Sequence, residues 1–151
     1  MLLLAALSCP PAHPMEPAAL ALPPSALALP PSTLALPPFE LIDEMHEFST
    51  EAARREDRRR IDLASAELAK ELQRRNLYRV VEGKTAAERV ARCWVQKVSN
   101  LILNLNIEVS TEKGETVYMT SVDIRGNTDE AWLRGVRRLV DNIEARSYHL
   151  R

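Results

Sequence analysis

The sequence predicts an α/β (α+β) fold: a small mixed sheet with a C-terminal antiparallel hairpin, packed by one long N-terminal helix and one C-terminal helix. Apolar residues recur at helical spacing within residues 50–75 and again within residues 127–143. Between them, apolar and polar residues alternate through residues 101–110 and 116–124, as in half-buried strands. This pattern indicates a sheet that is covered by helices on its apolar face.

The prolines mark a boundary near residue 38. All ten prolines lie at or before Pro38, whereas all four glycines lie at or after Gly83. Residues 19–39 repeat a seven-residue unit three times, each with Leu-Ala-Leu-Pro-Pro at its centre. A Pro–Pro pair in each unit favours an extended spacer or, less well, a ligand for an aromatic groove. The third copy continues into residues 39–43 and is expected to double as the first strand, at an edge or a bulge.

The chain is therefore divided into three parts. We expect residues 1–33 to form a signal-like, proline-rich leader that is largely disordered, residues 34–146 a single domain, and residues 147–151 a frayed end. Residues 1–9 are similar to the end of a secretory signal, with Leu-Ser-Cys9 as in a lipoprotein cleavage box, although no Lys or Arg precedes Arg54. These features predict a periplasmic or envelope protein, with Cys9 as a membrane anchor if it is lipidated. If the signal does not function, the protein is cytoplasmic.

The first helix has one apolar face, formed by Ile61, Ala64, Leu68 and Leu72, and Asn76 is suited to end it in a left-handed conformation. Its arginine-rich stretch, residues 54–60, raises the hypothesis of a nucleic-acid binder. Residues 51–75 nevertheless hold eight basic and six acidic side chains at spacings that pair opposite charges. We therefore favour a solvated helix face.

Two short strands are expected before the hairpin, at residues 78–81 and 93–98. Thr85-Ala-Ala-Glu88 has the spacing of a capping box, which predicts a brief helix that runs to about Arg92. A bend near Ser99 then leads into the longest strand.

Lys113-Gly114 is expected to close the hairpin, with Glu112 opposite Glu115. This register gives an apolar face made of alternate residues from both strands: Leu101, Leu103, Leu105, Ile107, Val109, Tyr118, Thr120, Val122 and Ile124. The opposite face is polar and consists of Asn104, Asn106, Glu108, Ser121, Asp123 and Arg125.

The last helix is predicted from a second capping box, Asn127-Thr-Asp-Glu130. Its apolar side chains then recur at helical spacing: Trp132, Val136, Leu139, Val140 and Ile143. We expect this face to cover the apolar face of the hairpin, and Gly135 to mark a close approach of helix and sheet.

Two long motifs carry a resemblance to a known family. Residues 94–106, WVQKVSNLILNLN, and residues 121–132, SVDIRGNTDEAW, closely resemble an uncharacterised family of small exported proteobacterial proteins, a domain of unknown function. Residues 39–43 and 77–81 resemble its earlier landmarks. The order of elements is similar to the N-terminal domain of TolB, which implies a fold but no activity.

The resemblance also implies a gap. Relatives carry a Cys-x-x-Cys segment, a helix and a further strand before the Trp-Val-Gln-Lys motif, whereas here Cys93 directly precedes Trp94. About twenty residues are absent by this comparison, which leaves Cys93 without its pair. We therefore hypothesise a deletion variant with a shortened central strand and reduced stability.

No nucleotide-binding, nucleophile-elbow or metal-spaced motif occurs in the sequence, so no catalytic, metal-binding or cofactor-binding residue is predicted. His13, His46 and His149 are too scattered to suggest a metal site. The polar cluster near residue 125 is explained by a turn at Gly126 and helix capping by Asn127 or Thr128, or alternatively forms a recognition surface. That candidate surface consists of Asn104, Asn106, Asp123, Arg125 and Asn127.

Three functions follow from these observations. The favoured one is a non-enzymatic envelope module that binds or assembles with a protein partner, and this function involves no cofactor or nucleic acid. The second is a small hydrolase-like enzyme that uses Glu108 or Asp123 as an acid or base, although no second group is visibly placed to orient either one. The third is a cytoplasmic nucleic-acid binder that uses Arg54 to Arg60.

Overall fold

The computed structural model describes residues 31–44, 46–99 and 101–147. Its elements in chain order are β1 (Thr33–Ala35), β2 (Glu40–Asp43), the 3-10 helix η2 (His46–Phe48), α1 (Glu51–Arg74), β3 (Arg79–Val81), β4 (Arg89–Lys97), β5 (Ile102–Thr111), β6 (Thr116–Arg125) and α2 (Asp129–Ser147). The signal-like start, Cys9, the first repeat, most of the second, His13 and His149 lie outside the described residues.

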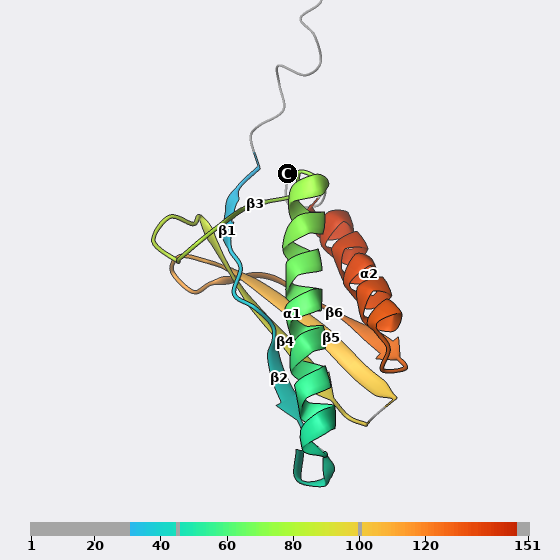
Figure 1. Ribbon diagram of the computed structural model, residues 1–151. Coiled ribbons are helices and arrows are strands. Elements are labelled where there is room, and N and C mark those ends of the chain that lie inside the picture. The colour runs from blue at the N-terminus through green and yellow to red at the C-terminus, as the bar shows by residue number, and fades with distance from the viewer. Residues whose placement is uncertain (1–30, 45, 100, 148–151) are drawn as a thin grey trace, which may run out of the picture.

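The strands form one mixed sheet in the order β3-β1-β4-β5-β6, and β2 also pairs with β4. Figure 1 shows α1 and α2 beside each other on one face of this sheet. The core lies between the two layers and includes Leu68 of α1, Leu105 of β5 and Leu139 of α2. The predicted fold class, a mixed sheet with a C-terminal hairpin and two packing helices, is confirmed.

The third repeat and the residues that follow it form two strands instead of one, β1 and β2, because Pro37-Pro38 lies between them. β1 and β2 both run parallel to β4, on the same side of it. Four residues lie between Ala35 and Glu40, whereas three lie between their partners Val90 and Trp94, so the proline pair occupies a bulge. β1 itself lies between β3 and β4 and is not an edge strand.

The long helix has the expected ends and the expected buried face. Thr50 caps α1, because its side chain accepts a hydrogen bond of 3.2 Å from the Ala53 N–H. The helix ends before Asn76, which has a φ of 55° and so adopts the left-handed conformation that stops a helix. All four predicted apolar positions of the helix are buried.

The brief helix predicted from Thr85 to about Arg92 is wrong. Residues 85 and 86 form a turn, and β4 is already extended from Arg89. Each of its nine residues has a partner in β5, and the Glu88 N–H donates to the Thr33 hydroxyl at 2.9 Å. Pairing with a long apolar neighbour outweighs the local capping pattern.

The expected gap falls within the central strand β4, between Cys93 and Trp94. The strand passes through Cys93 and Trp94 without a break and is nine residues long, beside a ten-residue neighbour. β4 is thus paired over its whole length, and the deletion relative to the family stays a prediction. The flanking strand β5 supplies a full-length partner, so pairing continues across the position of the expected gap.

The hairpin has the predicted register over most of its length, and Val109 lies opposite Tyr118. A bulge follows between Val109 and Ser110, so Ser110 pairs with Thr116 rather than with the next residue in that register. The predicted apolar face is buried except for Leu101, which is 68% exposed because β5 begins only after it.

The C-terminal helix packs on the hairpin as predicted, but its cap is not Asn127. The Thr128 hydroxyl accepts from the Ala131 N–H at 3.2 Å, so Thr128 is the N-cap. Gly135 does mark a close approach of helix and sheet. A Cβ at this position would lie 2.6 Å from the Cγ1 and Cδ1 atoms of Ile124.

Candidate functional site

The face of the sheet that points away from the helices forms one continuous surface, here called the open face. The Asn104 side chain lies on it and donates 2.7 Å to the Asp123 carboxylate, directly across the hairpin. Asn106 lies beside them and donates to the Asn104 carbonyl at 3.1 Å. Arg125 is exposed and follows Asp123 on the same face. The structure thus brings together four of the five residues of the candidate recognition surface, of which Asn106 is buried, at 8% exposed.

Asn127, the fifth, lies on the other side of the sheet. Its amide donates to Asp57 of α1 at 3.3 Å, and its carbonyl oxygen accepts from the Trp132 indole N–H at 2.8 Å. It therefore belongs to the interior between helices and sheet. The strand alternation that predicted the other four residues ends at Arg125, so it could not place Asn127.

Apolar side chains also lie on the open face. Ile42, Ile102 and Met119 are 43%, 49% and 55% exposed. Strand alternation places all three on the face opposite the core. The Arg92 guanidinium stacks over the Trp94 ring on this face, 5.2 Å from its centroid. Mixed apolar, aromatic and hydrogen-bonding groups of this kind are typical of protein interfaces.

The two carboxylates proposed for an enzyme do not form a pair. Asp123 lies opposite Asn104, whereas Glu108 lies four residues farther along β5, about 13 Å away at strand spacing. Each has its own neutral partner, because the Thr116 hydroxyl donates to Glu108 at 2.6 Å and Asn104 holds Asp123. This geometry does not suit acid–base catalysis between the two groups.

The arginines in residues 54–60 of α1 form ion pairs with neighbouring carboxylates. Arg59 and Arg60 both contact Asp129 at the start of α2 and Glu56 one turn before them. The hydrogen bond from Arg59 lowers the pKa of Asp129. Arg54 and Arg58 both pair with Glu51 in the first turn. Arg59 and Arg60 thus bridge α1 and α2, whereas Arg54 and Arg58 pair within α1, which confirms the expected charge pairing.

A buried polar network lies under the two long motifs. The Lys97 ammonium, 1% exposed, donates to Asp57 at 2.5 Å and lies 3.9 Å from Asp43. The other Asp57 oxygen accepts from Asn127, which holds Trp132. No buried side-chain nitrogen or oxygen of the described residues lacks a partner. The network is therefore satisfied within the protein and joins α1, β2, β4 and α2.

The network was missed in the sequence although two signals for it were present. Lys97 follows Cys93 and Val95 at alternate positions, so strand periodicity alone places its ammonium on the buried face. Asp57 lies one turn before Ile61 on the apolar face of α1. A buried cation of one element and a buried anion of another need each other as partners.

Cys93 lies in the same strand and faces the core. It is free and 1% exposed, and burial raises the pKa of its thiol to about 12. A thiol in this environment is neutral and inert at physiological pH. Cys93 therefore serves as a packed side chain of the core.

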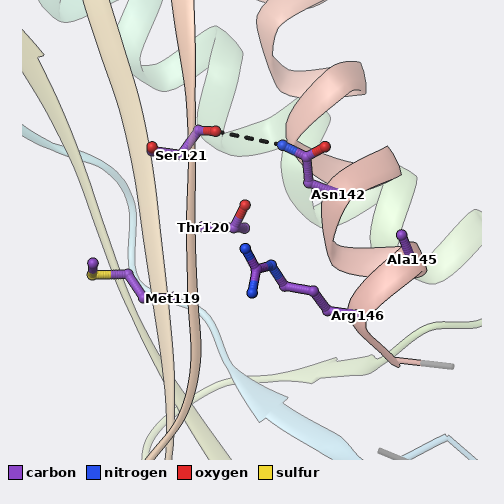
Figure 2. A pocket seen from close by; sticks show the side chains of 6 residues that line it. All are labelled: Met119, Thr120, Ser121, Asn142, Ala145 and Arg146. Atoms are coloured by element: carbon purple, nitrogen blue, oxygen red, sulfur yellow. Dashed lines mark hydrogen bonds between the residues drawn. The ribbon is translucent and has the colours of Figure 1, made fainter. Parts of the chain in front are cut away.

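A groove runs between the edge strand β6 and α2, with a volume of about 600 Å³. Its walls are Met119, Thr120 and Ser121 of β6 and Asn142, Ala145 and Arg146 of α2. Figure 2 shows the Arg146 side chain extending from α2 toward β6, and the Asn142 amide donating to the Ser121 carbonyl at 3.4 Å. Another hollow, of about 400 Å³, lies at the bulge of Pro37 and Pro38.

Two kinds of feature are absent from residues 31–44, 46–99 and 101–147. Within these ranges, no three His, Cys, Asp or Glu side chains are grouped closely enough to hold a metal ion. Neither α1 nor α2 combines the length and apolar character that a membrane-crossing helix requires.

Residues 83–143 match a family model described as a protein of unknown function (DUF2380). This range includes both long motifs. No curated protein matches the chain significantly. Among solved structures, the chain is similar to a single-substitution variant of PelC from Paraburkholderia phytofirmans, which is a dodecamer. The TM-score is 0.50 with 10% identity, over 76% of this chain and 86% of PelC. This likeness concerns the fold alone, and the similarity to TolB stays a prediction.

Proposed function

We propose that this protein is an exported envelope module without enzymatic activity, which binds or assembles with a protein partner through the open face of its sheet. The observation that carries the proposal is the composition of that face. The hydrogen-bonded pair of Asn104 and Asp123 is flanked there by exposed Ile102, Met119 and Arg125, and both helices lie on the other face. A polar pair with apolar neighbours supplies both specificity and buried area.

Two further observations support the proposal. The signal-like start and the resemblance of both motifs to an exported family support export. The dodecameric state of the PelC structure supports assembly as one use of this fold. We therefore expect the partner to be an envelope protein, either a different protein or another copy of this chain.

The test is crosslinking followed by affinity capture from the native cell, with intact-mass analysis of the captured protein. We expect a chain cleaved near Cys9, with added lipid if it is anchored, together with a specific crosslinked protein. The double substitution Asn104→Ala with Arg125→Ala should lower capture at least about fivefold, because it removes two groups of the face without touching the core.

A matched control is Glu115→Ala in the exposed hairpin turn, which should capture normally. Circular dichroism should show that all variants are folded. Equal capture by the double variant and the control would refute a role for the open face, and an uncleaved chain in the cytoplasm would refute export.

A further inference from the structure

The free edge of β6 forms a second surface, which borders the open face at Met119. β6 is ten residues long, and in the described sheet it pairs with β5 only. The opposite border of the sheet consists of short strands, namely β3 with three residues and β2 with four. Natural proteins usually block long edges, because unpaired backbone groups attract another strand. β6 contains no proline, and its bulge, at Val117, lies near its start, so the strand is paired regularly from Tyr118 to Arg125.

The ladder geometry fixes which backbone groups of β6 are free. The Gly126 N–H donates to the Leu101 carbonyl at 2.9 Å, and in an antiparallel pair such bonded positions recur at every second residue. Counting back from Gly126, the backbone groups of Ile124, Val122 and Thr120 therefore bond to β5. The intervening residues turn their N–H and C=O groups away from β5, toward the free edge: Met119, Ser121 and Asp123. The contact from Asn142 to the Ser121 carbonyl, in Figure 2, agrees with this assignment.

The helix side of the groove is basic. Arg146 extends across it (Figure 2), and Arg138 and Asn142 precede Arg146 at intervals of four residues on the same side of α2. Within the described part of the chain, neither Arg138 nor Arg146 forms an ion pair. By contrast, Arg75, which lies between the two helices, pairs with two carboxylates of α2.

We propose that the groove binds an extended segment of a partner protein by strand addition to β6, and that this segment carries Asp or Glu at positions that lie beside Arg146. The free backbone groups supply hydrogen bonds that do not depend on sequence, and alternate side chains of the added strand face α2. An acidic side chain there would be the missing counter-charge of Arg146. This inference goes beyond the proposed function, because it concerns a different surface.

The test begins with a random nine-residue peptide library displayed on phage and selected on the full chain. We expect enriched peptides to combine β-branched residues with Asp or Glu at alternate positions. The best peptide is then synthesised with a fluorescent label, and its affinity is measured by anisotropy. Arg146→Glu should weaken binding about tenfold or more. Lys70→Glu on α1 makes the same change of charge away from the groove and should alter affinity less than about twofold.

A second variant tests strand addition itself. Ser121→Pro removes an N–H that points to the groove and not to β5, so the fold tolerates it as proline in an edge strand. We expect this variant to keep its circular dichroism spectrum and lose peptide binding. In the wild type, bound peptide should slow hydrogen exchange at the Met119, Ser121 and Asp123 amides.

Three results would overturn the proposal. The first is that no peptide is enriched on the wild type more than on the Ser121→Pro variant. The second is that the peptide binds Arg146→Glu as tightly as the wild type, and the third is that bound peptide slows hydrogen exchange only at amides outside β6. The capture experiment on the open face uses other variants and another readout. Failure of one proposal therefore does not decide the other.

Discussion

At the scale of single residues, the buried Lys97 shows how the two long motifs are used. Lys97 belongs to the first motif, and Asn127 and Trp132 belong to the second. Asp57 of α1 joins them through both of its carboxylate oxygens. These motif residues thus hold the start of α2, the end of β4 and the first half of α1 together. Motif residues that contact solvent, such as Asn104 and Asp123, are the ones available for recognition.

This network makes a testable prediction. Lys97→Met should lower the free energy of unfolding by about 3–5 kcal/mol, because it leaves Asp57 buried without its cation. Lys97→Met combined with Asp57→Leu removes both charges and should be much less destabilising than the sum of the two single changes. Urea denaturation at pH 7 measures all three variants. Additive effects would mean that the two charges do not stabilise each other.

The same scale shows what could be predicted from the sequence at the candidate site. Strand alternation correctly grouped Asn104, Asn106, Asp123 and Arg125, since register alone decides which face a strand residue occupies. Asn127 was misplaced because it follows Gly126, whose φ of 92° turns the chain out of the strand. The groove beside Arg146 depends on how α2 lies against β6, and no local pattern encodes that distance.

At the scale of elements, the ends of the two helices are tied by charge. Arg75 contacts Glu71 of its own helix and both Asp141 and Glu144 of α2. The hydrogen bond from Arg74, with help from Arg75, lowers the pKa of the nearly buried Glu71 to about 2. The Glu71 carboxylate is therefore stabilised in the folded protein relative to the unfolded chain.

The pH dependence of stability follows from this shift. A carboxyl group whose pKa is lower in the folded state stabilises it above its ordinary pKa of 4.5, and the stabilisation is lost as the pH falls toward about 2. Glu71→Gln should thus cost about 1–3 kcal/mol at pH 7 and flatten the loss of stability between these pH values. Urea midpoints at several pH values measure the effect, with Glu115→Gln as the control. A variant as acid-sensitive as the wild type would contradict the assignment.

Elements also differ in how well the sequence predicts them. α1 and β5 were predicted because each has a long, regular pattern, in which many residues agree. The segment from Thr85 to Arg92 has a capping spacing but only a short apolar pattern, and its structure is decided by β5 on one side and by β1 on the other. Such a segment takes its conformation from partners that are distant in sequence.

At the scale of the whole molecule, the sheet order joins the proline repeat to the domain. β1 comes from the third repeat and lies between β3 and β4, with Leu34 fully buried. The third repeat is therefore part of the sheet, which its composition alone could not reveal. The Thr33 hydroxyl accepts from the Glu88 N–H, and the Ser32 carbonyl accepts from the Arg79 N–H at 3.0 Å. These bonds tie the third repeat to the rest of the sheet, and the domain boundary expected at residue 34 stays a prediction.

This arrangement predicts where the chain can be shortened. A chain that starts with Met before Pro31 should melt within about 2 °C of the full chain, because β1 and its hydrogen bonds are kept. A chain that starts before Phe39 loses β1 and the buried Leu34, and exposes the backbone of β3 and β4. We expect it to lose about 3 kcal/mol or more and to melt about 10–20 °C lower. Thermal melts by circular dichroism measure both. Equal melting of the two shortened chains would mean that the third repeat is a spacer and that β1 contributes nothing to the fold.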